Sequence, residues 1–208
     1  MAVSREFAET GSPRRYTTMD LVVMAVLGVV FGLINTPLGV FFQFLTASFG
    51  PIGQGFFAFW SISMVLTAFI VRKPGAAFIN GLINGLFQLL SGNPAGLVNL
   101  AWGFALGLGT EIGLVIYLRD RYLSGSWSFT WVTALLCGAI SNVLSFIVTM
   151  FAFNYFSNGP AIVVIGLVVQ VIAGSIESGL VAYGLGTLLA RSGLLKSFQA
   201  AAPSAARV

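Results

Sequence analysis

The ten lysine and arginine residues of this chain are confined to short polar segments that separate long apolar runs. They lie before residue 16, at 72–73, at 119–121 and beyond residue 190, and the connections around 35–53, 91–95 and 154–160 contain none. Only 8% of the residues are charged, compared with about 25% in soluble domains. Because basic residues gather on the cytoplasmic side of membrane proteins, the pattern predicts an all-α, polytopic integral membrane protein. We expect six transmembrane helices with both termini in the cytoplasm.

The apolar runs predict a single transmembrane domain over residues 18–192, with a cytoplasmic polar tail at 1–17 and a second cytoplasmic, disordered tail at 193–208. Arg14 and Arg15 precede the first apolar run, as they would in an export signal. No small-residue cleavage site follows them, so we interpret them as arginines that set the orientation of the first helix.

Several function classes are excluded by residues that the chain lacks. It has no histidine and one cysteine, Cys137, which excludes an internal disulfide and Ser-His catalysis and argues against zinc or haem. There is no P-loop, so we expect a non-enzyme without its own cofactor. The basic residues are explained by membrane topology, and we expect no nucleic-acid partner. Asn93-Pro94-Ala95 matches the aquaporin signature, but that fold needs two copies and the chain has one.

A stripe of amides marks the predicted helix 75–90. Asn80, Asn84 and Gln88 are spaced i, i+4, i+8, which places them within an arc of ~80°. An amide without a partner in hydrocarbon costs several kcal/mol. The stripe therefore predicts one wall of a small-molecule site. The alternative is that these amides join helices through hydrogen bonds of about 0.6 kcal/mol each.

Other polar side chains in the predicted helices 95–118, 129–153 and 161–190 complete the candidate site: Asn99, Trp102, Glu111, Asn142, Gln170 and Glu177. Glu111 and Glu177 are the only acids deep within predicted spans. An unpaired carboxylate there costs at least ~2.5–3.5 kcal/mol, so such acids are candidates for binding a cation or carrying protons. The alternative is a structural carboxylate bonded to hydroxyl or backbone N–H groups. A stand-alone proton-coupled carrier of a small heterocycle that uses both acids is thus a competing function.

The first apolar run predicts a helix from about residue 18 to 34, ended by Asn35, Thr36 and Pro37, because the residue before a proline disfavours the α region. Residues 38–50 are apolar but too short to span a bilayer, which indicates a re-entrant segment, an interfacial segment or a lid. As a lid, the loop 35–50 would include Asn35 and Gln43. Ala25, Gly28 and Gly32 give the first helix a small-residue face. Such a face allows close packing, either within the protein or on a partner subunit.

Three sequence blocks occur together: RKPGAA at 72–77, LL-x-GNP-x-G at 89–96 and GLG-x-E at 107–111. In these blocks the chain resembles the substrate-binding S-components of energy-coupling factor (ECF) vitamin transporters, in particular the YkoE type. The resemblance implies a six-helix subunit in the cell membrane of a prokaryote that captures a vitamin from outside. It also implies docking through Ala25, Gly28 and Gly32 on a transmembrane coupling subunit driven by two cytoplasmic ABC ATPases, which would bind the ATP.

YkoE-type S-components are associated with thiamine and its hydroxymethylpyrimidine moiety. The resemblance therefore implies that Asn84 and Gln88 bind an aminopyrimidine edge, that a tryptophan stacks on its ring, and that a carboxylate faces a thiazolium cation. The chain departs from the family where an acidic residue is common at the position of Gln88 and near Gly81. That departure shifts the expected ligand toward the neutral pyrimidine or another ring. A third class, a scaffold subunit, would bind no ligand.

Overall fold

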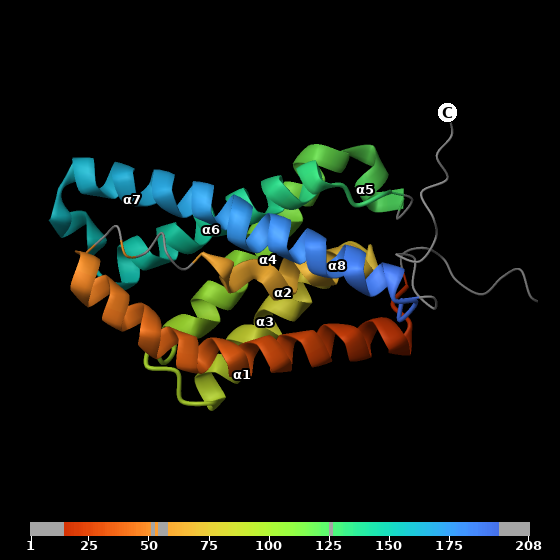
Figure 1. The fold of residues 1–208 in the computed structure, drawn as a ribbon, viewed down its shortest axis with the longest axis horizontal. Helices are drawn as coiled ribbons and strands as arrows, with labels where there is room; N and C mark the ends of the chain where they lie inside the picture. The colour runs from red at the N-terminus through yellow and green to blue at the C-terminus, as the bar shows by residue number, and fades with distance from the viewer. Residues whose placement is uncertain (1–14, 51–52, 54–57, 125–126, 196–208) are drawn as a thin grey trace, which may run out of the picture.

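The computed structural model describes residues 15–50, 53, 58–124 and 127–195, and every regular element in these residues is helical (Figure 1). In chain order they are α1 (Thr18–Phe49), η2 (Phe59–Ser61), α2 (Ile62–Val71), α3 (Ala76–Leu90), α4 (Val98–Leu118), α5 (Asp120–Ser124), α6 (Trp131–Ala152), η3 (Tyr155–Asn158), α7 (Pro160–Ala173), the π-helical η4 (Gly174–Leu180) and α8 (Val181–Arg191). The predicted all-α class is confirmed.

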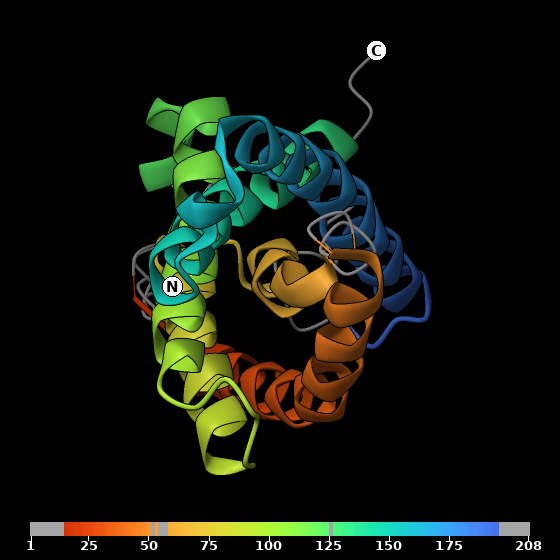
Figure 2. The same ribbon diagram turned by 90° about the vertical axis from the view of Figure 1, so that its left-hand side faces the viewer.

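The short helix α2 forms the centre of the bundle. All ten of its residues are buried, and Figure 2 shows it enclosed by a ring of the other long helices. Its sequence, ISMVLTAFIV, contains only Ser63 and Thr67 as polar residues and no charged residue. Apolar residues on all sides of a helix are typical of a helix surrounded by protein.

Four helical segments of the described residues are long and apolar enough to cross a membrane: Thr18–Phe49, Val98–Leu118, Trp131–Ala152 and Pro160–Arg191. Phe59–Val71 and Ala76–Leu90 are apolar but shorter. The 15 residues of α3 extend about 22 Å, less than the roughly 30 Å of a bilayer core. Residues 51–57, which precede η2, lie outside the described residues except for Gly53, as do most of both predicted tails.

The first residues of α1 and the last residues of α8 lie at the same end of the bundle (Figure 1). An even number of crossings requires this arrangement. At this end, the Lys73 ammonium lies 2.6 Å from the Asp20 carboxylate and donates to the Arg15 carbonyl at 2.7 Å. The Tyr16 hydroxyl donates to the Pro74 carbonyl at 2.5 Å, and burial raises the pKa of Tyr16 to about 12. These contacts join the turn between α2 and α3 to the start of α1.

The prediction that the first helix ends near residue 34 is wrong. α1 continues through Pro37 to Phe49, so Asn35 and Gln43 belong to a helix and not to a lid loop. A proline inside a helix costs about 3 kcal/mol, but contacts with the turn after α3 hold the helix on both sides of it. The Thr36 hydroxyl bonds to the Ser91 hydroxyl, and Gly39 packs on Asn93. Tertiary contacts therefore override the local preference.

The small-residue face of α1 is used inside the protein. A Cβ added to Gly28 would lie 2.7 Å from Ile83 Cγ2, and one added to Gly32 would lie 2.9 Å from the Asn84 carbonyl oxygen, both on α3. Gly28 and Gly32 are buried and Ala25 is partly exposed. The structure thus places the two glycines in the α1–α3 contact, which agrees with the internal-packing alternative, and docking on a coupling subunit stays a prediction.

Candidate functional site

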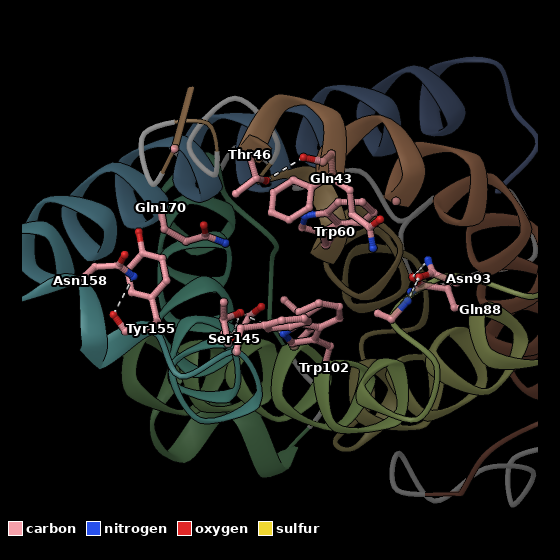
Figure 3. Close-up of a pocket in the computed structure, with 17 residues that line it drawn as sticks. Gln43, Thr46, Trp60, Gln88, Asn93, Trp102, Ser145, Tyr155, Asn158 and Gln170 are labelled. Atoms are coloured by element: carbon pink, nitrogen blue, oxygen red, sulfur yellow. Dashed lines mark hydrogen bonds between the residues drawn. The ribbon is translucent and has the colours of Figure 1, made fainter. Parts of the chain in front are cut away.

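A cavity of about 470 Å³ opens at the end of the bundle opposite the start of α1 (Figure 3). It is formed where the last turns of α1, the ends of α3 and α6, the start of α4, η2, η3 and α7 come together. Its lining residues are Gly39, Phe42, Gln43, Thr46, Gly50, Trp60, Gln88, Asn93, Ala95, Trp102, Leu106, Ser145, Thr149, Phe153, Tyr155, Asn158 and Gln170. The volume is in the range of sites for drug-sized ligands.

The walls of the cavity are aromatic. Trp102 stacks on Phe153 with ring centroids 5.7 Å apart, and its indole Nε1 donates to the Thr149 hydroxyl at 3.1 Å. Trp60 packs edge-on against Phe42 at 5.7 Å. Figure 3 shows Trp60 and Trp102 on facing sides of the cavity. Tryptophan faces in this arrangement can stack on a planar ring.

The first of two amide networks lies at the α3 end of the cavity. The backbone N–H of Ala95 donates to Asn93 Oδ1 at 3.0 Å, and Asn93 Nδ2 donates to Gln88 Oε1 at 3.1 Å. Gln88 Nε2 then donates to Asn84 Oδ1 at 2.7 Å. Asn84 in turn donates to the Ser63 hydroxyl on α2 at 3.3 Å. The network fixes the orientation of Gln88, which is 4% exposed.

The second network lies at the opposite end of the cavity, where Figure 3 shows Gln170 with Tyr155 and Asn158. Gln170 Nε2 donates to Asn142 Oδ1 at 3.1 Å. Asn142 Nδ2 donates to the carbonyls of Gly138, at 2.9 Å, and Ala58, at 3.4 Å. A buried asparagine thus orients a glutamine that lines the cavity, as Asn84 does for Gln88.

The structure brings four of the predicted residues to the cavity wall: Gln43, Gln88, Trp102 and Gln170. Asn84 and Asn142 lie one hydrogen bond behind it. Asn35, Asn80 and Asn99 are buried but do not line it. Asn80 donates to the Met24 carbonyl of α1 at 2.9 Å, and Asn99 donates to the Gly96 carbonyl at 2.8 Å. Asn80, Asn84 and Gln88 therefore share a buried helix face, but of these three residues only Gln88 lines the cavity.

Neither glutamate lines the cavity. The Glu111 carboxylate accepts hydrogen bonds from the backbone N–H groups of Ala77, at 2.8 Å, and Phe78, at 3.3 Å, and from the Tyr122 hydroxyl. It satisfies the first turn of α3, where Gly75 provides no side-chain cap. Glu177 accepts a hydrogen bond from the Ala58 N–H at 2.8 Å. Both acids follow the structural alternative, with backbone N–H groups as partners.

Sequence reasoning missed several lining residues. Asn93 belongs to the aquaporin-like signature and to the LL-x-GNP-x-G block, but the sequence prediction gave it no role in the site. Ser145 and Thr149 share a helix face with Asn142, at i+3 and i+7, but the predicted site included only Asn142 of the three. Tyr155 and Asn158 lie in η3, between α6 and α7, where the sequence shows no regular pattern. Burial raises the pKa of Tyr155, whose hydroxyl has no hydrogen-bond partner in the described residues.

Three comparisons with known proteins all find similarity to components of membrane transporters. The family model "ABC-type cobalt transport system, permease component" matches residues 19–144. The chain is 31% identical over 183 residues to "Putative HMP/thiamine permease protein YkoE" of Bacillus subtilis (strain 168), which covers 88% of each protein. It is also similar to a solved structure described as "Crystal structure of an S-component of ECF transporter", with a TM-score of 0.80 and 30% identity over 89% of this chain and 91% of that one.

Proposed function

The chain belongs to the family of ABC-type cobalt transport permease components, and from this premise we propose that it is the S-component of an ECF-type vitamin importer. Its ligand is thiamine or the hydroxymethylpyrimidine moiety, the two compounds named for the Bacillus subtilis relative. The chain captures the ligand from outside and delivers it through a coupling subunit and two ABC ATPases, which hydrolyse the ATP.

One observation carries this proposal: the cavity of about 470 Å³, whose aromatic walls end in two glutamines held by hydrogen bonds. A subunit that only scaffolds an assembly has no need of such a cavity. Oriented amides between aromatic faces are suited to a nitrogen heterocycle, because amides pair with its ring nitrogens and amino group while the faces stack on the ring.

The orientation in the membrane is part of the proposal. Lys73, Arg119 and Arg121 belong to the connections at the end of the bundle where α1 begins, and the cavity lies at the other end. By the positive-inside rule, the cavity then faces outward and both termini face the cytoplasm, with six crossings. In this proposal the chain lies in the cell membrane of a prokaryote, and its binding site is open to the external medium.

The competing proton-coupled carrier gains no support from the geometry. Such a carrier needs acids that face its solute or a water path, whereas Glu111 and Glu177 are bonded to backbone N–H groups and lie away from the cavity lining. We therefore do not assign a proton-transfer role to either residue.

Calorimetric titration of the full chain in lipid nanodiscs tests the proposal, with hydroxymethylpyrimidine and thiamine as the two ligands. We expect binding of at least one, and uptake into proteoliposomes only when the coupling subunit and both ATPases are present with ATP. Absence of binding by both would contradict the function. A pH gradient that drives uptake by the chain alone would instead establish the carrier.

A further inference from the structure

The hydrogen bonds around the cavity determine which polar atom each glutamine presents. At the Gln170 end, the nitrogen of Asn142 faces the carbonyls of Gly138 and Ala58, which can only accept. Asn142 Oδ1 must then accept, so Gln170 donates to it through Nε2 at 3.1 Å. Gln170 is 6% exposed, and its Oε1 has no donor among the described residues. This end of the cavity therefore presents a hydrogen-bond acceptor.

The same reasoning gives the opposite polarity at the Gln88 end. The backbone N–H of Ala95 can only donate, so Asn93 accepts through Oδ1 and donates through Nδ2 to Gln88 Oε1. Gln88 Nε2 donates one hydrogen to Asn84 Oδ1, and its second hydrogen has no acceptor in the part of the chain that the structure describes. This end therefore presents a hydrogen-bond donor.

Between the two ends, the described residues offer no partner for a fixed charge. None of the 17 described lining residues is Asp, Glu, Lys or Arg. Residues 51–57, which follow Gly50 in the sequence, are also uncharged. The Ser145 hydroxyl, in a residue 4% exposed, lines the cavity and makes no hydrogen bond within the described residues. Its O–H group and lone pairs add an uncharged hydrogen-bond donor and acceptor close to Asn142 on α6.

We infer that the site selects a neutral ring by this polarity: a ligand acceptor pairs with Gln88 Nε2, and a ligand amine or hydroxyl pairs with Gln170 Oε1 and Ser145. The inference rests on the proposed function and names its substrate class. A permanently cationic ligand would exchange its hydration for a lining that holds no counter-ion among the described residues, so it is disfavoured. The neutral aminopyrimidine should therefore bind in preference to thiamine, which carries the same pyrimidine with a thiazolium cation attached.

The test is a pair of titrations of the full chain in nanodiscs with hydroxymethylpyrimidine and with thiamine. We expect the neutral compound to bind at least about tenfold more tightly. Equal or tighter binding of thiamine would overturn the inference while leaving the proposed function intact, and would show that the aromatic walls hold the cation. Absence of binding by both would overturn the proposed function, and the inference with it.

A variant that adds a negative charge to the cavity tests whether the charge of the ligand, and not its size, determines the ratio of the two dissociation constants. Gln170→Glu puts a carboxylate at the acceptor end, and we expect it to shift the ratio of the two dissociation constants toward thiamine by about tenfold. Ser157→Asp is the matched control, because it adds a carboxylate to η3 on an exposed residue outside the lining. An unchanged ratio in Gln170→Glu, or an equal shift in Ser157→Asp, would contradict the inference. If Gln170→Glu does not fold, the ratio measured on the unmodified chain still decides.

Discussion

The Glu111 carboxylate accepts a hydrogen bond from the N–H of Ala77, 34 residues earlier in the chain, at 2.8 Å, and so joins two of the sequence blocks. GLG-x-E ends with this acid, and RKPGAA ends with this amide. The carboxylate lies at the first turn of α3, where the helix dipole and unpaired N–H groups stabilise negative charge. The acid that the sequence offered as a ligand or proton carrier is thus the cap of a helix that supplies one end of the cavity.

Glu111→Gln should lower the stability of the protein and leave its ligand affinity nearly unchanged. Glutamine keeps one oxygen for the Ala77 and Phe78 N–H groups, but its NH2 group replaces the oxygen that accepts from the Tyr122 hydroxyl. The loss of the negative charge also weakens both backbone hydrogen bonds, so we expect a cost of about 1–3 kcal/mol. The measurement is the thermal unfolding midpoint in detergent, together with the dissociation constant for hydroxymethylpyrimidine. Asp120→Asn, an exposed acid on α5, is the control and should change neither value. Weaker binding at unchanged stability would contradict this prediction and would assign Glu111 to ligand binding.

Gln88→Ala and Asn80→Ala should separate the two halves of the amide stripe. Gln88 lines the cavity, so its truncation should weaken ligand binding about tenfold or more. Asn80 donates to α1 at the Met24 carbonyl, so its truncation should cost about 1 kcal/mol of stability with binding preserved. Titration and thermal unfolding of both variants check this. A stripe that acted as one binding wall would lose affinity in both.

Ser145→Ala and Ser141→Ala form a second matched pair, one helical turn apart on α6. Ser145 has no protein partner for its hydroxyl among the described residues, so removing it should leave the unfolding midpoint unchanged and weaken ligand binding several-fold. The Ser141 hydroxyl donates to the Gly138 carbonyl at 3.0 Å and lies 2.8 Å from the Ser61 hydroxyl, which can donate to it, so its loss should lower the midpoint. Unaltered affinity in Ser145→Ala would argue that this hydroxyl faces only water.

Gly103→Ala should destabilise the crossing of α3 and α4. A Cβ at Gly103 would lie 3.0 Å from Gly85 Cα and closer still to the Gly81 carbonyl, so the helices must separate, at about 1–3 kcal/mol or more. Gly184→Ala in α8 is the control, because a Cβ there meets nothing within 4 Å. It should be neutral or stabilising by up to about 1 kcal/mol through helix propensity. Unfolding midpoints that fall equally in both variants would contradict the close α3–α4 contact.

Much of the fold was predictable because hydrophobicity and helical periodicity are local properties. The predicted helices 75–90, 95–118, 129–153 and 161–190 match α3, α4, α6 and the run from α7 to α8 within a few residues. The shared buried face of Asn80, Asn84 and Gln88 followed from their spacing alone. The end of α1 was not predictable from the sequence. Pro37 locally favours an end of the helix, but contacts with residues 91–93 stabilise its continuation to Phe49.

The sequence by itself determined that this is a helical membrane protein of the S-component type and which face of each helix carries polar groups. The tertiary structure alone decided which of those groups meet a ligand cavity: Gln88 and Gln170 line it, while Glu111 and Asn80 find partners in the backbone of neighbouring helices. The reason is physical. Periodicity sets the direction in which a side chain leaves its helix, but its hydrogen-bond partner depends on which helix packs opposite.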